Sequence, residues 1–207
     1  MRAFKRLAAV TAIAGLLAGG TAASASAATR PATQPLARVH LTGGTTAVTT
    51  SSAIAETLLK NGIVPIAVAP GQESLTLGHS GPAVRFTFPV TGGHLNPKPL
   101  GGKINHAGGI LFIDLSTGKQ IEVSSFTISL VQQNLTGIVN GNPKERAPLF
   151  HLNLSHAQVA VGKHSATAAN IGVTLTSTAA SALNSALGTS LFTAGLALGT
   201  AQTAVRF

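Results

Sequence analysis

The sequence predicts a mainly β protein, either an antiparallel β-sandwich or a flattened barrel, with two short helices. Short runs in which apolar and polar residues alternate fill most of the chain, and Gly, Asn and Pro residues separate them. No strand is followed by a long crossover helix until the very end, which disfavours a parallel α/β sheet. This pattern predicts roughly eight to eleven short strands.

The first 27 residues predict a secretory signal peptide. Arg2, Lys5 and Arg6 precede an apolar run over 7–20, and small residues then lead to an A-x-A cleavage pattern at 25–27. The apolar run is shorter than the roughly 20 residues that are needed to cross a bilayer. We therefore expect cleavage and a secreted protein, extracellular or associated with the cell wall, with no transmembrane segment afterwards.

The rest of the chain predicts a flexible N-terminal segment over 28–41, rich in Thr, Pro and Ala, and a single β-rich domain over 42–207. The leader holds three of the 14 basic residues, so 11 bases and 5 acids remain, a net charge of +6. These bases are scattered, and the chain has no Trp or Tyr to stack on nucleobases, which disfavours nucleic-acid binding. The absence of Cys excludes disulfides and thiolate sites.

Two similar units predict the helices. In TTAVTTSSAIAETLLKNG, the Ser pair at 51–52 offers an N-cap for a helix over 53–60. In IGVTLTSTAASALNSALG, the Ser-Thr pair at 177–178 precedes an Ala-rich helix that ends at Gly188. We expect both helices to cover ends or edges of the sheet.

Three features of the strands can be placed from the sequence. The strand over 84–90 directs its Phe side chains to one face, because they alternate with polar residues. The alternation changes parity at Ser124-Ser125, which predicts a β-bulge. Gly92-Gly93 predicts a turn from the strand over 84–90 toward the next strand.

The sequence predicts no enzyme. One Asp and four Glu remain after the leader, far apart in the chain, and no motif pairs them for glycoside hydrolysis. Asp114 is interpreted as a strand-end residue that faces a turn. LGHSGP at 77–82 lacks the G-x-S-x-G spacing of a serine hydrolase, and Gly92-Gly93 and Gly101-Gly102 open no helix that would bind phosphate.

Histidine is the residue type that offers a candidate ligand site. Imidazole is the most common metal ligand among side chains, and the chain has seven His. His106 stands before Gly108-Gly109, where small neighbours allow a ligand to come close, and His94 lies in the same Gly-rich stretch. Two readings stay open: these residues bind a ligand, or they are structural histidines hydrogen-bonded to loop carbonyls. His151 and His156, five positions apart, would face opposite sides of one strand.

Four blocks within residues 46–205 carry a family resemblance. They are RFTFPVTGGHLNPKPLGGKINHAGGILF, QIEVSSFTISL, LFHLNLSHAQV and VTLTSTAASALNSALGTSLFTAGLALGTA. Together they resemble secreted actinobacterial β-rich proteins that are similar in layout to the HtaA, or haem-transport-associated, domains. The resemblance implies a β-rich domain that binds haem at the cell envelope, where similar proteins pass it toward an importer. Haem binding in that family is associated with a tyrosine ligand assisted by histidine, and this chain has no Tyr.

Two classes of function follow. The first is a non-catalytic binding module of the cell envelope, for haem or another small hydrophobic ligand, with His94 and His106 as candidate binding residues. The second is a structural or adhesive surface protein that interacts with wall polymers or with another envelope protein. A shared fold does not distinguish these two classes of function, because function depends on the site.

Overall fold

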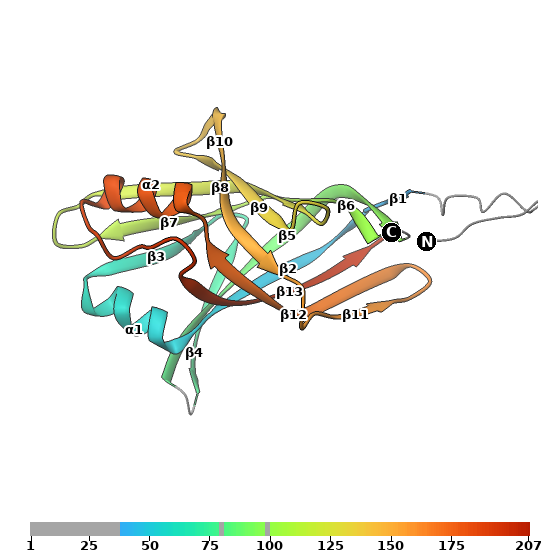
Figure 1. Cartoon of the computed structure of the whole chain (residues 1–207), viewed down its shortest axis with the longest axis horizontal. Coiled ribbons are helices and arrows are strands. Elements are labelled where there is room, and N and C mark those ends of the chain that lie inside the picture. Colours follow the sequence, from blue (N-terminus) through green and yellow to red (C-terminus); the bar gives the residue numbers. More distant parts are fainter. Residues whose placement is uncertain (1–37, 79–80, 98–99) are drawn as a thin grey trace, which may run out of the picture. The chain divides into compact units, whose positions relative to one another are not determined.

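The computed structural model describes residues 38–78, 81–97 and 100–207 (Figure 1). The predicted signal peptide over 1–27 lies outside the described residues, and so does most of the segment over 28–41. The end of that segment belongs to the domain, since β1 (Val39–His40) pairs with a long strand and Leu41 is buried. No helix within the described ranges has the length and apolar character needed to cross a membrane.

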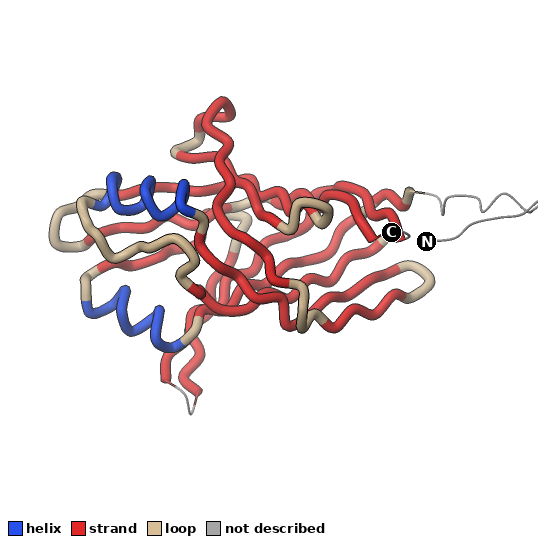
Figure 2. Tube along the Cα trace, viewed as in Figure 1, coloured by secondary structure: helices blue, strands red, loops and turns tan. Residues whose placement is uncertain are grey.

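The described residues form strands and two helices (Figure 2), as predicted, but the thirteen strands exceed the predicted eight to eleven. After β1 the strands are β2 (Gly43–Thr50), β3 (Ile63–Val68), β4 (Gln72–Gly78), β5 (Gly81–Pro97), β6 (Leu100–His106), β7 (Gly109–Asp114), β8 (Gln120–Ser129), β9 (Asn134–Val139), β10 (Asn142–Asn153), β11 (Gln158–Val161), β12 (Ser165–Leu175) and β13 (Ala197–Arg206). The helices are α1 (Ser52–Lys60) and α2 (Ser177–Leu187).

Eight of the strands close into an antiparallel barrel. The pairing runs β5-β2-β13-β12-β10-β9-β8 and returns from β8 through β6 to β5. The remaining strands extend this ring: β1 and β4 pair with β5, β11 pairs with β12, and β7 and β3 continue from β8. The sequence left a sandwich and a flattened barrel open, and the pairing gives a closed ring in which each of these eight strands has a neighbour on both sides.

The barrel wall divides where β6 ends. β6 pairs with β5 over 90–97 and with β8 over 127–129. The first parts of β5 and β8 pair instead with β4 and β7, and β3 adds to β7. Between the two resulting ribbons, the carboxylate of Glu73 in β4 accepts a hydrogen bond from the backbone N–H of Ala67 in β3. The helices contact these widened parts of the wall, α1 against β5 and β3, and α2 against β10 and β8.

Both helices begin at a hydroxyl cap. The Ser51 side chain accepts from the N–H of Ile54, so the prediction at 51–52 is confirmed. The cap of α2 is Thr176, one residue before the predicted pair, and its hydroxyl accepts from Ala179 N–H. The same hydroxyl donates to the carbonyl of Pro148 at 2.7 Å, which ties α2 to β10. Gly188 ends α2 in the left-handed conformation, as predicted.

The predicted bulge is present, but the predicted turn is wrong. Ser125 has a positive φ of 52°, and the register between β8 and β9 shifts there. Gly92-Gly93 does not turn the chain, because β5 continues through it to Pro97. A Cβ on Gly93 would lie 2.1 Å from the carbonyl oxygen of Lys103 in β6. Glycine is needed here for the close approach of β6 rather than for a reversal of direction.

We expect the substitution Thr176→Val to lower the free energy of unfolding by about 0.5–2 kcal/mol, because it removes a helix cap and the donor to the part-buried Pro148 carbonyl. Thr176→Ser keeps the hydroxyl and serves as the matched control. Urea unfolding followed by circular dichroism measures both. Equal stability of the Val variant and the native chain would contradict the assigned role of this hydroxyl.

Candidate functional site

An apolar cavity lies inside the wider part of the barrel, between α1 and α2. It encloses about 1000 Å³ of space between atoms, counting the part that is open to solvent. About half of the lining residues belong to β5, β7, β8, β10 and β12. The helices contribute Ile54 and Leu58 from α1 and Thr178, Ala179, Ala182 and Leu183 from α2.

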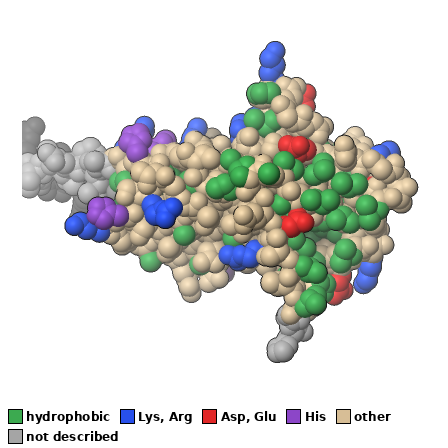
Figure 3. All heavy atoms as spheres, turned by 180° about the vertical axis from the view of Figure 1, so that it is seen from behind, with side chains coloured by type: hydrophobic (Ala, Val, Ile, Leu, Met, Phe, Trp, Pro, Cys, Tyr) green, Lys and Arg blue, Asp and Glu red, His purple; other side chains and the backbone are tan. Residues whose placement is uncertain are grey.

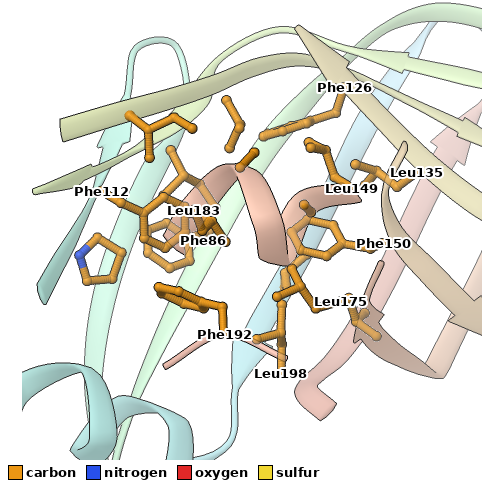
Figure 4. Close-up of a pocket in the computed structure, with 18 of the residues that line it drawn as sticks. Phe86, Phe112, Phe126, Leu135, Leu149, Phe150, Leu175, Leu183, Phe192 and Leu198 are labelled. Atoms are coloured by element: carbon orange, nitrogen blue, oxygen red, sulfur yellow. The ribbon is translucent and has the colours of Figure 1, made fainter. Parts of the chain in front are cut away.

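Phenylalanine dominates the lining. Six of the eight Phe of the chain face this space: Phe86, Phe88, Phe112, Phe126, Phe150 and Phe192. Five of them lie on β5, β7, β8 and β10, and Phe192 lies in the loop between α2 and β13. Phe88 and Phe126 pack edge to face with their ring centres 4.9 Å apart. Figure 4 shows side chains from several elements directed toward one common space.

The chemistry of the lining is almost uniform. Its polar side chains are the hydroxyls of Thr50 and Thr178, and no lining residue is charged or is a histidine. Such a wall offers dispersion contacts and burial of apolar surface, and it offers no side-chain ligand for a metal ion. Throughout the part of the chain that the structure describes, no group of three His, Asp or Glu side chains is placed to hold a metal.

His106, a predicted site residue, is buried in the barrel outside this cavity. It is the last residue of β6 and is 5% exposed. Its Nε2 lies 2.7 Å from Thr46 Oγ1, and that oxygen lies 3.0 Å from Thr203 Oγ1. Its Nδ1 lies 3.4 Å from the carbonyl oxygen of Phe126. The three side chains form a polar layer that joins β2, β6 and β13 across the barrel.

The partners of His106 determine its neutral form. A carbonyl oxygen can only accept, so Nδ1 carries the proton, and Nε2 accepts from the Thr46 hydroxyl. Thr46 Oγ1 in turn accepts from the Thr203 hydroxyl. Burial lowers the pKa of His106 from 6.5 to about 4, although the hydrogen bond to Phe126 opposes this. The ring is therefore neutral at physiological pH, and both of its nitrogens are occupied.

His94, the other predicted site residue, lies on the outer face of the barrel. It stands directly opposite His40 of β1 and Lys103 of β6. Partial burial and the positive charges of Arg38, His40 and Lys103 lower its pKa. The structure therefore does not bring His94 and His106 together, because His106 faces inward.

The other residues considered from the sequence have ordinary roles or lie outside the described residues. Asp114 Oδ1 accepts from Ser116 N–H and Oγ–H at 2.8 and 2.6 Å, as expected for a strand-end residue at a turn. These hydrogen bonds, with those from Thr117, lower the pKa of Asp114 to about 2. His151 is exposed on β10, and β10 ends before His156, so the two do not share a strand. His79 and Ser80 lie outside the described residues.

The sequence reasoning concentrated on histidine and missed the cavity. The signal was present in the alternation of the strands, which predicted one apolar face for 84–90. That alternation does not reveal whether apolar faces fill the barrel or leave space in it. Residues distant in sequence, such as Ile54, Phe126 and Ala182, meet at the cavity only through the closure of the barrel.

Comparison with known proteins identifies the fold. No protein-family model matches the sequence, and no curated protein matches it. Among solved structures, the chain is similar to the C-terminal domain of HtaA from Corynebacterium glutamicum, with a TM-score of 0.56 and 17% identity. The match covers 81% of this chain and 98% of that one. A domain-swapped dimer of a variant of the same domain gives a TM-score of 0.48 at 18% identity, over 75% of this chain and 91% of that chain. The HtaA-like fold predicted from the four sequence blocks is confirmed.

The buried imidazole predicts a pH-dependent stability. Above pH 6.5 His106 is neutral in both the folded and the unfolded chain. As the pH falls from 6.5 toward 4, the unfolded chain takes up the proton first, so the free energy of unfolding decreases. A pKa lowered from 6.5 to about 4 corresponds to at most about 3 kcal/mol.

We expect His106→Gln to lower stability at pH 7 and to flatten the decrease between pH 6.5 and 4, because the titrating group is gone. His156→Gln, at an exposed position, is the control and should leave the free energy of unfolding at pH 7 unchanged. Urea titrations across this range provide the measurement. An unchanged pH slope in His106→Gln would show that His106 is not buried in its neutral form.

Proposed function

We propose that this chain is a non-catalytic binding module of the cell envelope, which holds a small hydrophobic ligand in the apolar cavity between α1 and α2. The observation that carries the proposal is the lining of this cavity, which has six Phe and no charged side chain. Ligand sites of proteins usually have mostly apolar walls with a small number of polar groups. Export, predicted from residues 1–27, places the module outside the cell.

Haem is the ligand that the HtaA-like fold favours within this class. His94 and His106 stay the predicted haem-binding residues, but their surroundings argue against coordination. His106 would have to give up its hydrogen bond to Thr46, and His94 lies on the outside of the barrel. We infer that a porphyrin in this cavity is held by apolar contacts and not by a bond from a side chain to iron. Interaction with wall polymers stays a prediction from composition.

The cavity can be tested with the uncharged fluorophore N-phenyl-1-naphthylamine. We expect its emission to rise on binding and Ala182→Phe to weaken binding by tenfold or more, because the new ring occupies the cavity. Ser181→Phe, on the exposed face of the same helix, is the matched control and should bind as the native chain does. Equal binding by Ala182→Phe and the native chain would place the fluorophore elsewhere.

The mode of porphyrin binding can be tested by comparing haem with metal-free protoporphyrin IX. We expect both to bind with affinities within about threefold of each other, because no iron ligand lines the cavity. His94→Ala and His106→Ala should leave the haem absorption spectrum unchanged at temperatures where both variants are folded. Much tighter binding of haem that is lost in either variant would instead establish histidine coordination. Failure of both porphyrins to bind would remove haem as the ligand.

A further inference from the structure

A second apolar cavity lies in the narrower part of the barrel, which the first cavity does not reach. It encloses about 580 Å³, counting the part open to solvent. The space exists because several lining side chains are small, among them Ala166, Ala168 and Ala201. The polar residues of the lining are Thr167 and Thr203. Val159 of β11 lines it and is 50% exposed, so β11 forms part of its rim.

The two cavities occupy successive lengths of the same strands. β8 contributes Phe126 to the first cavity and Ile128 to the second. The polar layer of Thr46, His106 and Thr203 borders the second cavity, because Thr203 is one of its lining residues. A molecule in the second cavity therefore contacts a different set of side chains from a molecule in the first.

The outer wall of the second cavity carries a row of bases. His40, His94 and Lys103 lie directly opposite one another on the adjacent strands β1, β5 and β6, so their side chains share one face of the sheet. Arg38 precedes β1, and its charge acts on His94. Four groups that are positive or can become positive thus lie together.

A second group of bases joins this row. Arg206 stands at the end of β13 opposite Gly43 and Ser165, and Lys163 and His164 lie in the turn between β11 and β12. Backbone hydrogen bonds connect the two groups, from Thr42 N–H to the Arg206 carbonyl and from Leu41 N–H to the Gly93 carbonyl. We call these seven residues the basic end: Arg38, His40, His94, Lys103, Lys163, His164 and Arg206.

No acidic residue of the described ranges lies among them. Glu56 is on α1, Glu73 on β4, Asp114 at the end of β7, Glu122 near the start of β8 and Glu145 on β10. Figure 3 shows the same separation, because the His side chains visible there gather toward one end of the domain and the visible acidic side chains lie away from them. The Lys and Arg side chains of the basic end therefore give it a net positive charge.

The basic end and the second cavity are parts of one wall. His94 precedes Leu95, Lys103 precedes Ile104, and Arg206 follows Val205, and in each pair the apolar residue lines the cavity. Neighbouring residues of a strand face opposite sides. The apolar interior and the basic exterior consequently meet at the rim where these strands end.

We propose that the second cavity binds a long-chain carboxylate, with the alkyl chain inside the barrel and the carboxylate at the basic end. The cavity gives the chain an apolar environment, and Lys103 and Arg206 give the head group cationic donors. Exposed Val159 and Val161 extend the apolar surface from the rim. A purely polar anion would use the bases and leave the cavity empty, so an amphiphile fits the observations better.

Dodecanoate and its neutral analogue dodecanol are suitable probes for calorimetric titration of the purified chain. We expect Ala168→Leu to weaken both by about tenfold, because the added side chain fills the cavity. Ala169→Leu, at the next residue, which is not part of the lining, is the matched control.

The charge of the basic end is tested by combining Lys103→Gln with Arg206→Gln. This double variant should weaken dodecanoate binding by about threefold to tenfold and leave dodecanol binding unchanged. Lys144→Gln, on the β10 hairpin, controls for loss of charge elsewhere.

Two further results distinguish this site from the first cavity. Ala182→Phe, which blocks the first cavity, should leave dodecanoate binding unchanged. Bound carboxylate should also raise the pKa of His94 in NMR titration, because it offsets the charges of Arg38, His40 and Lys103. The proposal is overturned if dodecanoate does not bind, if Ala182→Phe abolishes its binding, or if the double Gln variant binds dodecanoate like the native chain.

Discussion

The pairing of β6 with β5 on one side and β8 on the other is the constraint on which the rest of the structure depends. β6 is the strand that joins β5 to β8 and so closes the ring. Its approach to β5 requires two glycines, since a Cβ on Gly93 or on Gly102 would lie 2.1 Å from a backbone oxygen of the opposite strand. β6 ends at His106, and the imidazole at that position ties it to β2 and to the carbonyl of Phe126 in β8. The close approach of the β5 and β6 backbones and the buried side chain of His106 thus keep the barrel closed.

The end of β6 also determines where space opens inside the barrel. Beyond His106 the strands β5 and β8 separate and take β4 and β7 as partners, so the interior widens and the two helices cover it. Large aromatic residues line this wider part without filling it. In the narrower part, alanines at several positions leave a smaller space. Both spaces have mostly apolar walls. The polar side chains of Thr46, His106 and Thr203, which border the second space, hydrogen-bond to one another.

Much of the fold could be predicted from local patterns. The alternation of apolar residues indicates strands, Ser51 and Gly188 mark helix ends through backbone chemistry, and Ser124-Ser125 marks a bulge through its parity change. The turn predicted at Gly92-Gly93 is wrong because a glycine pair indicates either a turn or a close approach of two backbones, and the sequence does not separate these. The helix cap at Thr176 was placed one residue late because three successive hydroxyl residues offer the same side-chain acceptor.

The candidate site was harder to predict than the fold. The sequence indicates His106 as a candidate ligand, but Thr46 and Thr203 are 60 and 97 residues away in the chain, so its buried, hydrogen-bonded state depends on closure of the barrel. The grouping of His40, His94 and Lys103 at the basic end also depends on the folded structure, because they become neighbours only through the register of three strands. A cavity has no local signature at all, since it depends on which apolar side chains fail to meet.

The contact between Glu73 and Ala67 has a consequence for how this chain behaves beside other copies of itself. β3 pairs with β7 alone, so its other side is a free sheet edge of the kind that recruits foreign strands. On that side, the N–H of Ala67 is occupied by the Glu73 carboxylate, and Pro65, two residues earlier, has no N–H to offer. Two successive donor positions are therefore closed to an incoming strand. A strand as apolar as Ile63–Val68 can thus remain at the edge of a sheet without templating aggregation.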